Sequence, residues 1–411
     1  MNGKKKLLIV NNNLDIGGIQ KSLVNLLYEL DKKKLYDIDL FLFSNSGEYK
    51  SDIPPSIKVI EGNKFVKLLG VSQVDSKKIG LLYYLLRGLA VVYTGIINRR
   101  FPIKLILKTQ KKIKNYDVAI SFMHEPDSHT FYGGCNEFVI DRVIAEKKIT
   151  FVHCDFLNYG GNNRFNCSLY EKFDAIATVS KGCRENFIKA NPKLKNKTFI
   201  VQNCQNYKEI IKKANQTHKI YEKDNFNIIT VSRLSEEKGI IRTINIIEKL
   251  VTDNEKIKWH IVGSGSLESD IRSIIKSRKL EKNIIIYGNQ ENPYKFIKNA
   301  DLFLLPSYHE AAPMVFDEAK YLGVPILTTN ITSAEEMVAK YLAGWVCENS
   351  EEGIYYSLKN IIDNREELNK VKRQLKELSY NNKIPIEQFE NLISNKGAGK
   401  IWKKKREGNI H

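Results

Sequence analysis

The stretch Asp301-Leu-Phe-Leu-Leu-Pro-Ser-Tyr-His-Glu310-Ala-Ala-Pro313-Met-Val-Phe-Asp-Glu318 combines the features that decide the fold. Its apolar run, residues 302–305, predicts a buried strand, and a short turn follows. Pro313 predicts the start of a helix, because proline suits the first helical turn. Glu310 is therefore expected in the turn and Glu318 inside the helix. The free amides at such a helix start favour an anion, and a diphosphate bound there would have one glutamate beside each of its two substituents.

Short β-type runs alternate with helical segments along the chain, which is typical of parallel sheets covered by helices on both faces. The pattern restarts near Asn225, after a polar stretch at residues 205–225 that we expect to link two domains. The predicted strands span residues 6–10, 38–43, 57–60, 118–122, 149–153, 175–179, 198–201, 228–231, 259–262, 284–287, 302–305 and 325–328.

We therefore predict an α/β chain of two Rossmann-like, doubly wound domains that face a central cleft, with ligands beyond the carboxyl ends of the strands. The expected domains are residues 1–205 and 206–385, followed by a basic tail or helix at 386–411 that contains Lys400–Arg406. A length of 411 residues also favours two domains over one core.

Cysteine usage and the first residues indicate the compartment. The six cysteines show neither a CxxC pair nor a metal-ligand spacing, so we interpret them as reduced thiols. The segment Met1–Val10 is basic but holds too few apolar residues for the core of a signal peptide. We therefore expect a cytoplasmic protein.

The net charge of +18 is concentrated in one segment. Residues 76–116 contain no acidic residue, and residues 81–97 within them are apolar apart from Arg87. The basic residues there are Lys77, Lys78, Arg87, Arg99, Arg100, Lys104, Lys108, Lys111, Lys112 and Lys114. This pattern suits a segment lying in an anionic lipid interface, and equally a buried helical hairpin with solvated lysines. Nucleic acid is disfavoured, because the aromatic residues lie in aliphatic sequence and are not interleaved with the charges.

Four further features follow predicted strands. Gly17-Gly18 opens a helix after the first strand, where the lack of side chains would let an anion approach the backbone. Arg233 and Lys238 follow the strand at 228–231 and could neutralise two phosphates. Gly263 and Gly265 follow the strand at 259–262, and His153 ends the strand at 149–153. His124-Glu125 is a weaker candidate pair.

Together these motifs resemble those of retaining glycosyltransferases with the GT-B fold, particularly family 4 (glycosyl transferases group 1). Glu310 and Glu318 are similar to its Glu-x7-Glu signature, and Arg233 with Lys238 to its Arg-x4-Lys-Gly motif. Gly17-Gly18 resembles its glycine-rich loop. The pair Gly263 and Gly265 resembles its Val-Gly-x-Gly segment, and His153 its histidine at the cleft edge.

The resemblance implies a role for each site residue. Arg233, Lys238, Glu310 and His153 would be catalytic, with Glu310 on the sugar hydroxyls. Glu318 would bind the ribose, and the remaining donor-binding candidates are Gly17, Gly18, Gly263, Gly265, Asn289, Tyr294, Ala312, Pro313, Met314 and Val315. Ala311 stands where the family usually has glycine, which leaves the donor sugar open. No Asp-x-Asp pair follows a strand, so no metal and no cofactor are expected.

The implied function is transfer of a hexose, with retention, from a UDP-sugar or GDP-sugar to a growing, lipid-linked bacterial surface glycan of the capsule, exopolysaccharide or cell-wall type. The enzyme would work at the inner face of the membrane, held there by residues 76–116. The alternatives are a GT-B 2-epimerase acting on nucleotide sugars, a phosphorylase, and a basic protein that binds nucleic acid or membranes without catalysis.

Overall fold

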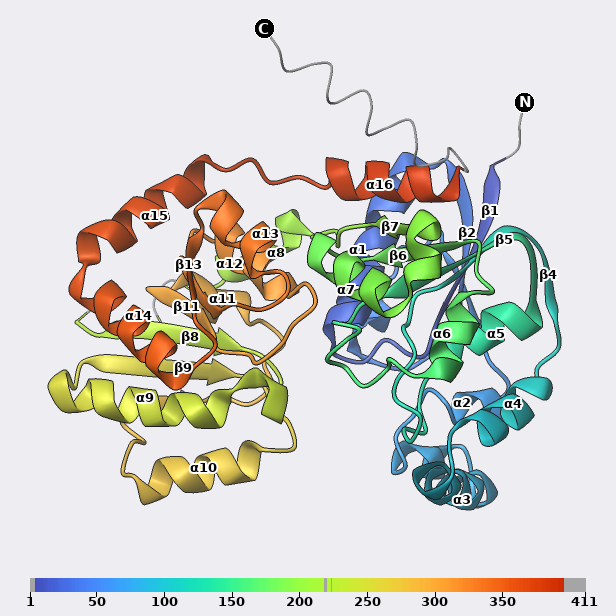
Figure 1. The fold of residues 1–411 in the computed structure, drawn as a ribbon, viewed down its shortest axis with the longest axis horizontal. Coiled ribbons are helices and arrows are strands. Elements are labelled where there is room, and N and C mark those ends of the chain that lie inside the picture. Colours follow the sequence, from blue (N-terminus) through green and yellow to red (C-terminus); the bar gives the residue numbers. More distant parts are fainter. Residues whose placement is uncertain (1–3, 218–219, 223, 395–411) are drawn as a thin grey trace, which may run out of the picture. The chain divides into compact units, whose positions relative to one another are not determined.

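The computed structural model describes residues 4–217, 220–222 and 224–394 of the chain. It divides into two compact units (Figure 1). Unit 1 holds the described parts of Met1–Cys204 and Asn382–His411, and unit 2 is Gln205–Asn381. Lys400–Arg406, the basic part of the expected tail, lies outside the described residues.

Unit 1 is built on a parallel sheet whose described strands run in the order β3-β2-β1-β4-β5-β6-β7. The side chains of β1 alternate between two hydrophobic clusters, Leu7 and Ile9 in one and Leu8 and Val10 in the other, so both faces of the sheet are buried. The strands are β1 (Lys5–Asn11), β2 (Tyr36–Leu42), β3 (Lys58–Glu61), β4 (Ile113–Ser121), β5 (Val143–Val152), β6 (Ala175–Thr178) and β7 (Thr198–Ile200).

The described helices of unit 1 are α1 (Gly18–Lys33), α2 (Lys64–Lys67), α3 (Leu81–Ile96), α4 (Arg100–Lys108), α5 (Cys135–Arg142), α6 (Arg164–Tyr170), α7 (Lys181–Ala190) and α16 (Lys383–Ile393), with short 3-10 turns at Glu48–Asp52, Asp75–Lys78 and Pro192–Lys197. Helices α1, α5 and α7 contact strands of the sheet, whereas α3 packs against α4. Helix α16 returns to unit 1 from the end of the chain, because Ile386 and Phe389 are buried in the same cluster as Leu7. The expected tail at residue 386 therefore begins inside a helix of unit 1.

Unit 2 repeats the design with a parallel sheet of order β10-β9-β8-β11-β12-β13. Its strands are β8 (Phe226–Val231), β9 (Ile257–Val262), β10 (Ile284–Ile286), β11 (Leu302–Leu305), β12 (Ile326–Thr329) and β13 (Gly344–Cys347). Its helices are α8 (Tyr207–Ala214), α9 (Ile240–Asp253), α10 (Glu268–Ser277), α11 (Tyr294–Lys298), α12 (Met314–Tyr321), α13 (Ala334–Met337), α14 (Glu351–Asp363) and α15 (Arg365–Glu377), with 3-10 turns at Glu236–Lys238 and Ala339–Tyr341.

Every strand expected from the sequence is present, and β13 is an addition. The polar stretch at residues 205–225, which we expected to link the two domains, is largely folded. It contains α8, which packs against α11 and α12, and its side chain Gln205 donates from Nε2 to the Met314 carbonyl at 3.0 Å. Most of the stretch is therefore part of the folded unit 2.

Helix α3 contradicts the expectation of a buried hairpin, because it exposes most of its large apolar side chains. Two of the charges assigned to the lipid surface are buried instead. Arg87 donates to the Leu68 carbonyl at 3.2 Å, and Arg99 is 1% exposed. Within the described ranges, none of the helices has the length and hydropathy needed to cross a bilayer.

Candidate active site

The order of strands in unit 2 predicts where its ligand site lies. Strand β8 comes first along the chain, and its neighbours β9 and β11 are reached by connections that run in opposite directions across the sheet. In open parallel sheets the crevice beyond the carboxyl ends of two such strands is the usual ligand site. The loops at this crevice are residues 232–239, after β8, and residues 306–313, after β11.

Lys238 and Glu310 lie on these two loops and contact each other. The Nζ atom of Lys238 is 2.6 Å from Oε1 of Glu310, and both side chains are only 14% and 13% exposed. The hydroxyl of Ser307 donates to the same carboxylate oxygen at 2.8 Å. The structure thus joins the cation of one predicted motif to the first glutamate of the other.

Arg233 is held more loosely. Its side chain is 75% exposed and lies 3.4 Å from Glu237, which also accepts a hydrogen bond from Ser235. Burial would raise the pKa of Glu237, but the Ser235 hydroxyl, the backbone and the charges of Lys238 and Arg233 together lower it below its ordinary value. Glu237 is therefore an anion that pairs with the exposed guanidinium of Arg233.

Glycines hold this loop against its neighbours. A Cβ on Gly263 would lie 1.9 Å from the Ser232 carbonyl oxygen, and one on Gly265 would lie 2.3 Å from the Leu234 carbonyl oxygen. Gly239 has a φ of +65°, and its Cβ would lie 2.2 Å from the Pro306 carbonyl oxygen. Only glycine permits such close backbone contacts. The glycines after β9 therefore position the loop that carries Arg233 and Lys238.

Arg242 fixes the loop after β11, a role that the sequence did not suggest. Its guanidinium donates to the Pro306 carbonyl at 2.6 Å and to Asn349 at 2.7 Å. It also lies 3.8 Å from the ring centroid of Tyr308. Arg242 lies in the first turn of α9 and is buried at 6% exposure, and no motif in the sequence marks it.

Helix α12 begins at Met314, with Pro313 as the residue before its first turn. Proline has no N–H, so Pro313 cannot be an anion donor as expected, and the amides left for that role are those of Ala312, Met314 and Val315. Glu318 lies within α12 at 1% exposure. Its carboxylate is thus in the interior, whereas Glu310 lies at the partly open crevice.

Tyr294 is misassigned by the sequence. It is 4% exposed and packs in the interior against Ile210 and Ala214 of α8, which leaves almost none of it open to a donor. Asn289, in contrast, is exposed after β10.

In unit 1 the corresponding crevice lies between β1 and β4, where the connections again diverge. Gly17 precedes α1 with extended backbone, and Gly18 begins the helix. A Cβ on Gly18 would meet nothing within 4 Å, which leaves open space on that side of the loop. The preceding Asn13 anchors the loop by donating to Asp15 at 2.7 Å and to the Gly70 carbonyl at 2.8 Å.

His153 and His124 also lie at this end of the sheet. The His153 ring lies 4.8 Å from Phe122 and 5.5 Å from Phe151, and its Nε2 atom is buried without a hydrogen bond among the described residues. Burial, then the neighbouring His124, lowers the pKa of His153 to about 3, and burial lowers that of His124 to about 4. Both rings are neutral at pH 7 and can accept or donate one hydrogen bond.

Glu125, the expected partner of His124, is engaged elsewhere. It forms a buried ion pair with Arg99, which also lies 3.5 Å from Glu137. Burial and the charge of Glu125 raise the pKa of Glu137 well above its ordinary value. Glu125 therefore belongs to a structural cluster that fixes the loop after β4, and the pair His124-Glu125 is not a catalytic dyad.

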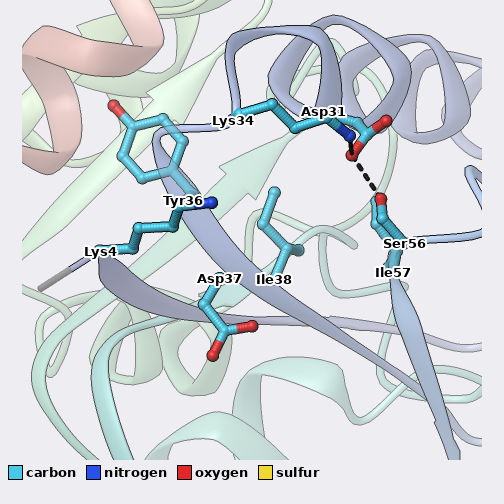
Figure 2. Close-up of a pocket in the computed structure, with 8 residues that line it drawn as sticks. All are labelled: Lys4, Asp31, Lys34, Tyr36, Asp37, Ile38, Ser56 and Ile57. Atoms are coloured by element: carbon cyan, nitrogen blue, oxygen red, sulfur yellow. Dashed lines mark hydrogen bonds and ion pairs between the residues drawn. The ribbon is translucent and has the colours of Figure 1, made fainter.

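No group of three or more His, Cys, Asp or Glu side chains in the described part of the chain is arranged to hold a metal ion. A separate hollow lies at the edge of unit 1, between α1 and β2 (Figure 2). There Asp31 pairs with Lys34 at 2.7 Å and accepts a hydrogen bond from Ser56, and these two contacts lower the pKa of Asp31. The hollow contains none of the predicted site residues.

Comparison with known proteins identifies unit 2. Residues 210–378 match the family model of Glycosyl transferases group 1. Unit 2 is a group 1 glycosyltransferase domain. This domain contains the Lys238–Glu310 pair and both loops of the crevice, so the motifs that carried the resemblance lie inside the matched region.

Individual relatives cover less of the chain. CapM of Staphylococcus aureus, a capsular polysaccharide biosynthesis glycosyltransferase, is 25% identical over 53% of this chain and 61% of its own length. A Campylobacter jejuni N-acetylgalactosamine-N,N'-diacetylbacillosaminyl-diphospho-undecaprenol 4-alpha-N-acetylgalactosaminyltransferase is 29% identical over 49% of this chain and 54% of its own length. The chain spans between 35% and 61% of the first curated relatives that it matches.

The fold is common to solved structures over nearly the whole chain. S. aureus TarM, crystallised with Fondaparinux, alpha-GlcNAc-glycerol and UDP, superposes with a TM-score of 0.65 at 14% identity, covering 95% of this chain and 100% of TarM. The chain therefore has the GT-B fold that the resemblance implied, in both of its Rossmann-like units.

Proposed function

We propose that this chain is a retaining glycosyltransferase that moves a hexose from a nucleoside-diphosphate sugar to a lipid-linked surface glycan. The observation that carries the proposal is the Lys238–Glu310 contact of 2.6 Å at the crevice of a group 1 glycosyltransferase domain. The names of the relatives support the setting, since one is a capsule enzyme and another names a diphospho-undecaprenol substrate. The UDP in the TarM crystal supports a nucleoside diphosphate as leaving group.

The catalytic candidates and the first amides of α12 have these roles in the scheme. Lys238 and Arg233 neutralise the diphosphate, and the first amides of α12 contact its oxygens. Glu310 binds hydroxyls of the donor sugar and keeps the Lys238 ammonium at the crevice. His153, neutral at pH 7, would offer a hydrogen bond to an acceptor bound by unit 1.

The chemical step needs no protein nucleophile in this proposal. The bond between the anomeric carbon and the diphosphate oxygen breaks, and a bond to the acceptor oxygen forms on the same face of the sugar. The acceptor proton passes to the departing phosphate. Negative charge grows on the diphosphate as it leaves, so the cations stabilise the transition state more than the bound donor, which is the condition for catalysis. No metal ion takes part.

The test is transfer from a panel of UDP-hexoses and GDP-hexoses to an alkyl-diphosphate-linked hexose in detergent. We expect release of one nucleoside diphosphate, a product heavier by one hexose, and by NMR the anomeric configuration of the donor. Lys238→Ala should lower kcat/KM by about 100-fold or more, as removal of a preorganised charge stabiliser does. Lys249→Ala, an exposed lysine on α9, is the control and should be unchanged.

A chelator provides the second arm of this test. Turnover should persist in EDTA, because cations of the protein replace a metal in the proposal. Inversion of configuration would contradict the retaining mechanism. Full activity of Lys238→Ala would contradict its role on the leaving group. Loss of turnover in EDTA, restored by divalent ions, would contradict catalysis without a metal.

A further inference from the structure

Helix α3 buries polar side chains and exposes apolar ones, which is the opposite of an ordinary surface helix. Its interior side holds Arg87 at 7% exposure and Thr94 at 0%, whereas Leu81 is 72%, Leu85 54% and Leu89 69% exposed. Arg87 is satisfied inside by the Leu68 carbonyl and by Gln73 at 3.0 Å. The interior contacts of Arg87 fix the rotation of α3, and the leucines on its other side therefore face outward.

Helix α4 extends this face. Phe101 is 61% and Leu105 57% exposed, and together with Leu89, Val92 and Tyr93 of α3 they line an open apolar groove of about 500 Å³. Tyr93 and Phe101 hold the two helices together with ring centroids 5.8 Å apart. The helices lie together at one end of unit 1, beyond α2 (Figure 1). We call this surface the α3–α4 face.

The segment that carries the α3–α4 face has charges of one sign. Residues 76–116 contain no Asp or Glu, and the exposed basic residues on α4 or just before α3 are Lys77, Lys78, Arg100, Lys104 and Lys108. Lys78 pairs with Asp75, just outside the segment, at 2.6 Å. An apolar face on a cationic segment is complementary to a bilayer whose surface is anionic.

We propose that the α3–α4 face is a peripheral membrane anchor that inserts into the interface of an anionic lipid bilayer. The leucines of α3 and Phe101 of α4 would reach the acyl boundary, while the lysines contact lipid phosphates. Insertion is parallel to the surface, because Arg87 and its partners occupy the opposite side of α3. The proposal extends the proposed function by bringing the enzyme to a lipid-linked acceptor, yet the exposed face alone carries it.

The same charges argue against a second copy of the chain as the occupant. Two copies that met symmetrically through the α3–α4 face would bring their lysines together, and like charges at an interface oppose association. A bilayer with phosphatidylglycerol removes that repulsion and covers the apolar side chains at the same time.

The first experiment is co-flotation of the full chain with vesicles of phosphatidylcholine alone or with 30% phosphatidylglycerol, a composition chosen at about the anionic content that attracts basic segments. We expect binding to the anionic vesicles, weakened by salt because the charges are exposed. Leu85→Glu should lower the partition coefficient by about tenfold or more, since a buried leucine is lost and a like charge is added. Leu35→Glu, at the same 54% exposure outside the face, should bind like the wild type.

The second experiment measures insertion directly. In Leu89→Trp, brominated lipid acyl chains should quench the new tryptophan, whereas quenching equal to that of the wild type would mean that the face does not insert. Absence of wild-type binding to anionic vesicles, or Leu85→Glu binding as well as Leu35→Glu, would overturn the proposal. Self-association that Leu85→Glu abolishes, without vesicle binding, would assign the face to a second copy instead. Nucleotide titration of the same variants separates this outcome from failure of the proposed function, because binding of a nucleotide does not require the α3–α4 face.

Discussion

Gly263 has a φ of +138° and touches the backbone of Ser232, so the glycine motif after β9 acts on the loop of Lys238. In sequence the same motif was interpreted as part of the donor-binding site. The structure instead predicts that a methyl group at residue 263 would clash with the backbone of Ser232. Such a clash cannot be relieved by moving a flexible side chain, so it should destabilise the fold.

Gly263→Ala should therefore lower the free energy of unfolding of unit 2 by about 3 kcal/mol or more, because backbone strain and a steric clash add. Gly288→Ala is the matched control. Its φ is +67°, but its Cβ would meet nothing within 4 Å, so only about 1 kcal/mol of strain is expected. Urea unfolding measures both, and equal losses would contradict the close backbone contact.

His153 predicts a pH dependence of stability. Its pKa is about 3 in the fold against an ordinary value of 6.5, so the unfolded chain binds more protons between these values and stability falls as the pH is lowered through 6.5. Each such histidine costs about 1.4 kcal/mol per pH unit in this range. His153→Asn should show a shallower loss between pH 7 and pH 5 than the wild type in urea unfolding. His129→Asn, at an exposed site, should keep the wild-type slope, and a steeper or unchanged slope in His153→Asn would refute the account.

The sequence predicted Lys238 and Glu310 as separate motifs, but their contact depends on two loops 72 residues apart and on the order of strands that brings them together. Tyr294 was misassigned because its partners lie on α8, in a stretch whose composition is typical of a linker. Arg87 and Arg99 were assigned to the surface because a sequence does not show which side of a helix faces the core.

At the scale of elements, apolar runs of four or more residues predicted the strands. Strand β13 was missed, because Gly344-Trp-Val-Cys347 begins with glycine and is only partly buried. Helix α16 was assigned to a tail, although its apolar residues fill unit 1. No local pattern reveals which core an amphipathic helix covers when another domain lies between it and its partners in sequence.

Phe389→Ala in α16 should therefore destabilise unit 1, by about 3 to 5 kcal/mol, as deletion of a buried phenylalanine does. Hydrogen exchange should become faster in β1 and β2, whose side chains share the cluster of Phe389. Leu375→Ala in α15 is the matched control, and should act on β11 and β12 of unit 2. Loss of protection in unit 2 from Phe389→Ala would contradict this placement of α16.

On the scale of the molecule, each unit is a doubly wound sheet with its divergent connections at β1 and β4 or at β8 and β11. That repetition explains why the fold could be predicted throughout, since alternating strands and helices occur in both halves of the sequence. In unit 2, polar residues with recognisable spacing follow β8 and β11, and the structure brings two of them, Lys238 and Glu310, into contact. In unit 1 the loops after β4 and β5 place two buried histidines, His124 and His153, whose burial a sequence pattern does not reveal.

The central claim is that unit 2 binds a nucleoside diphosphate through Lys238 and Arg233. Calorimetric titration of UDP and GDP into the full chain tests this claim most directly. We predict that one nucleotide binds and that Arg233→Ala/Lys238→Ala together weaken binding by about tenfold or more, because two charge-assisted contacts are lost. Lys249→Ala should leave the affinity unchanged. Failure of both nucleotides to bind, or wild-type affinity in the double variant, would contradict the claim.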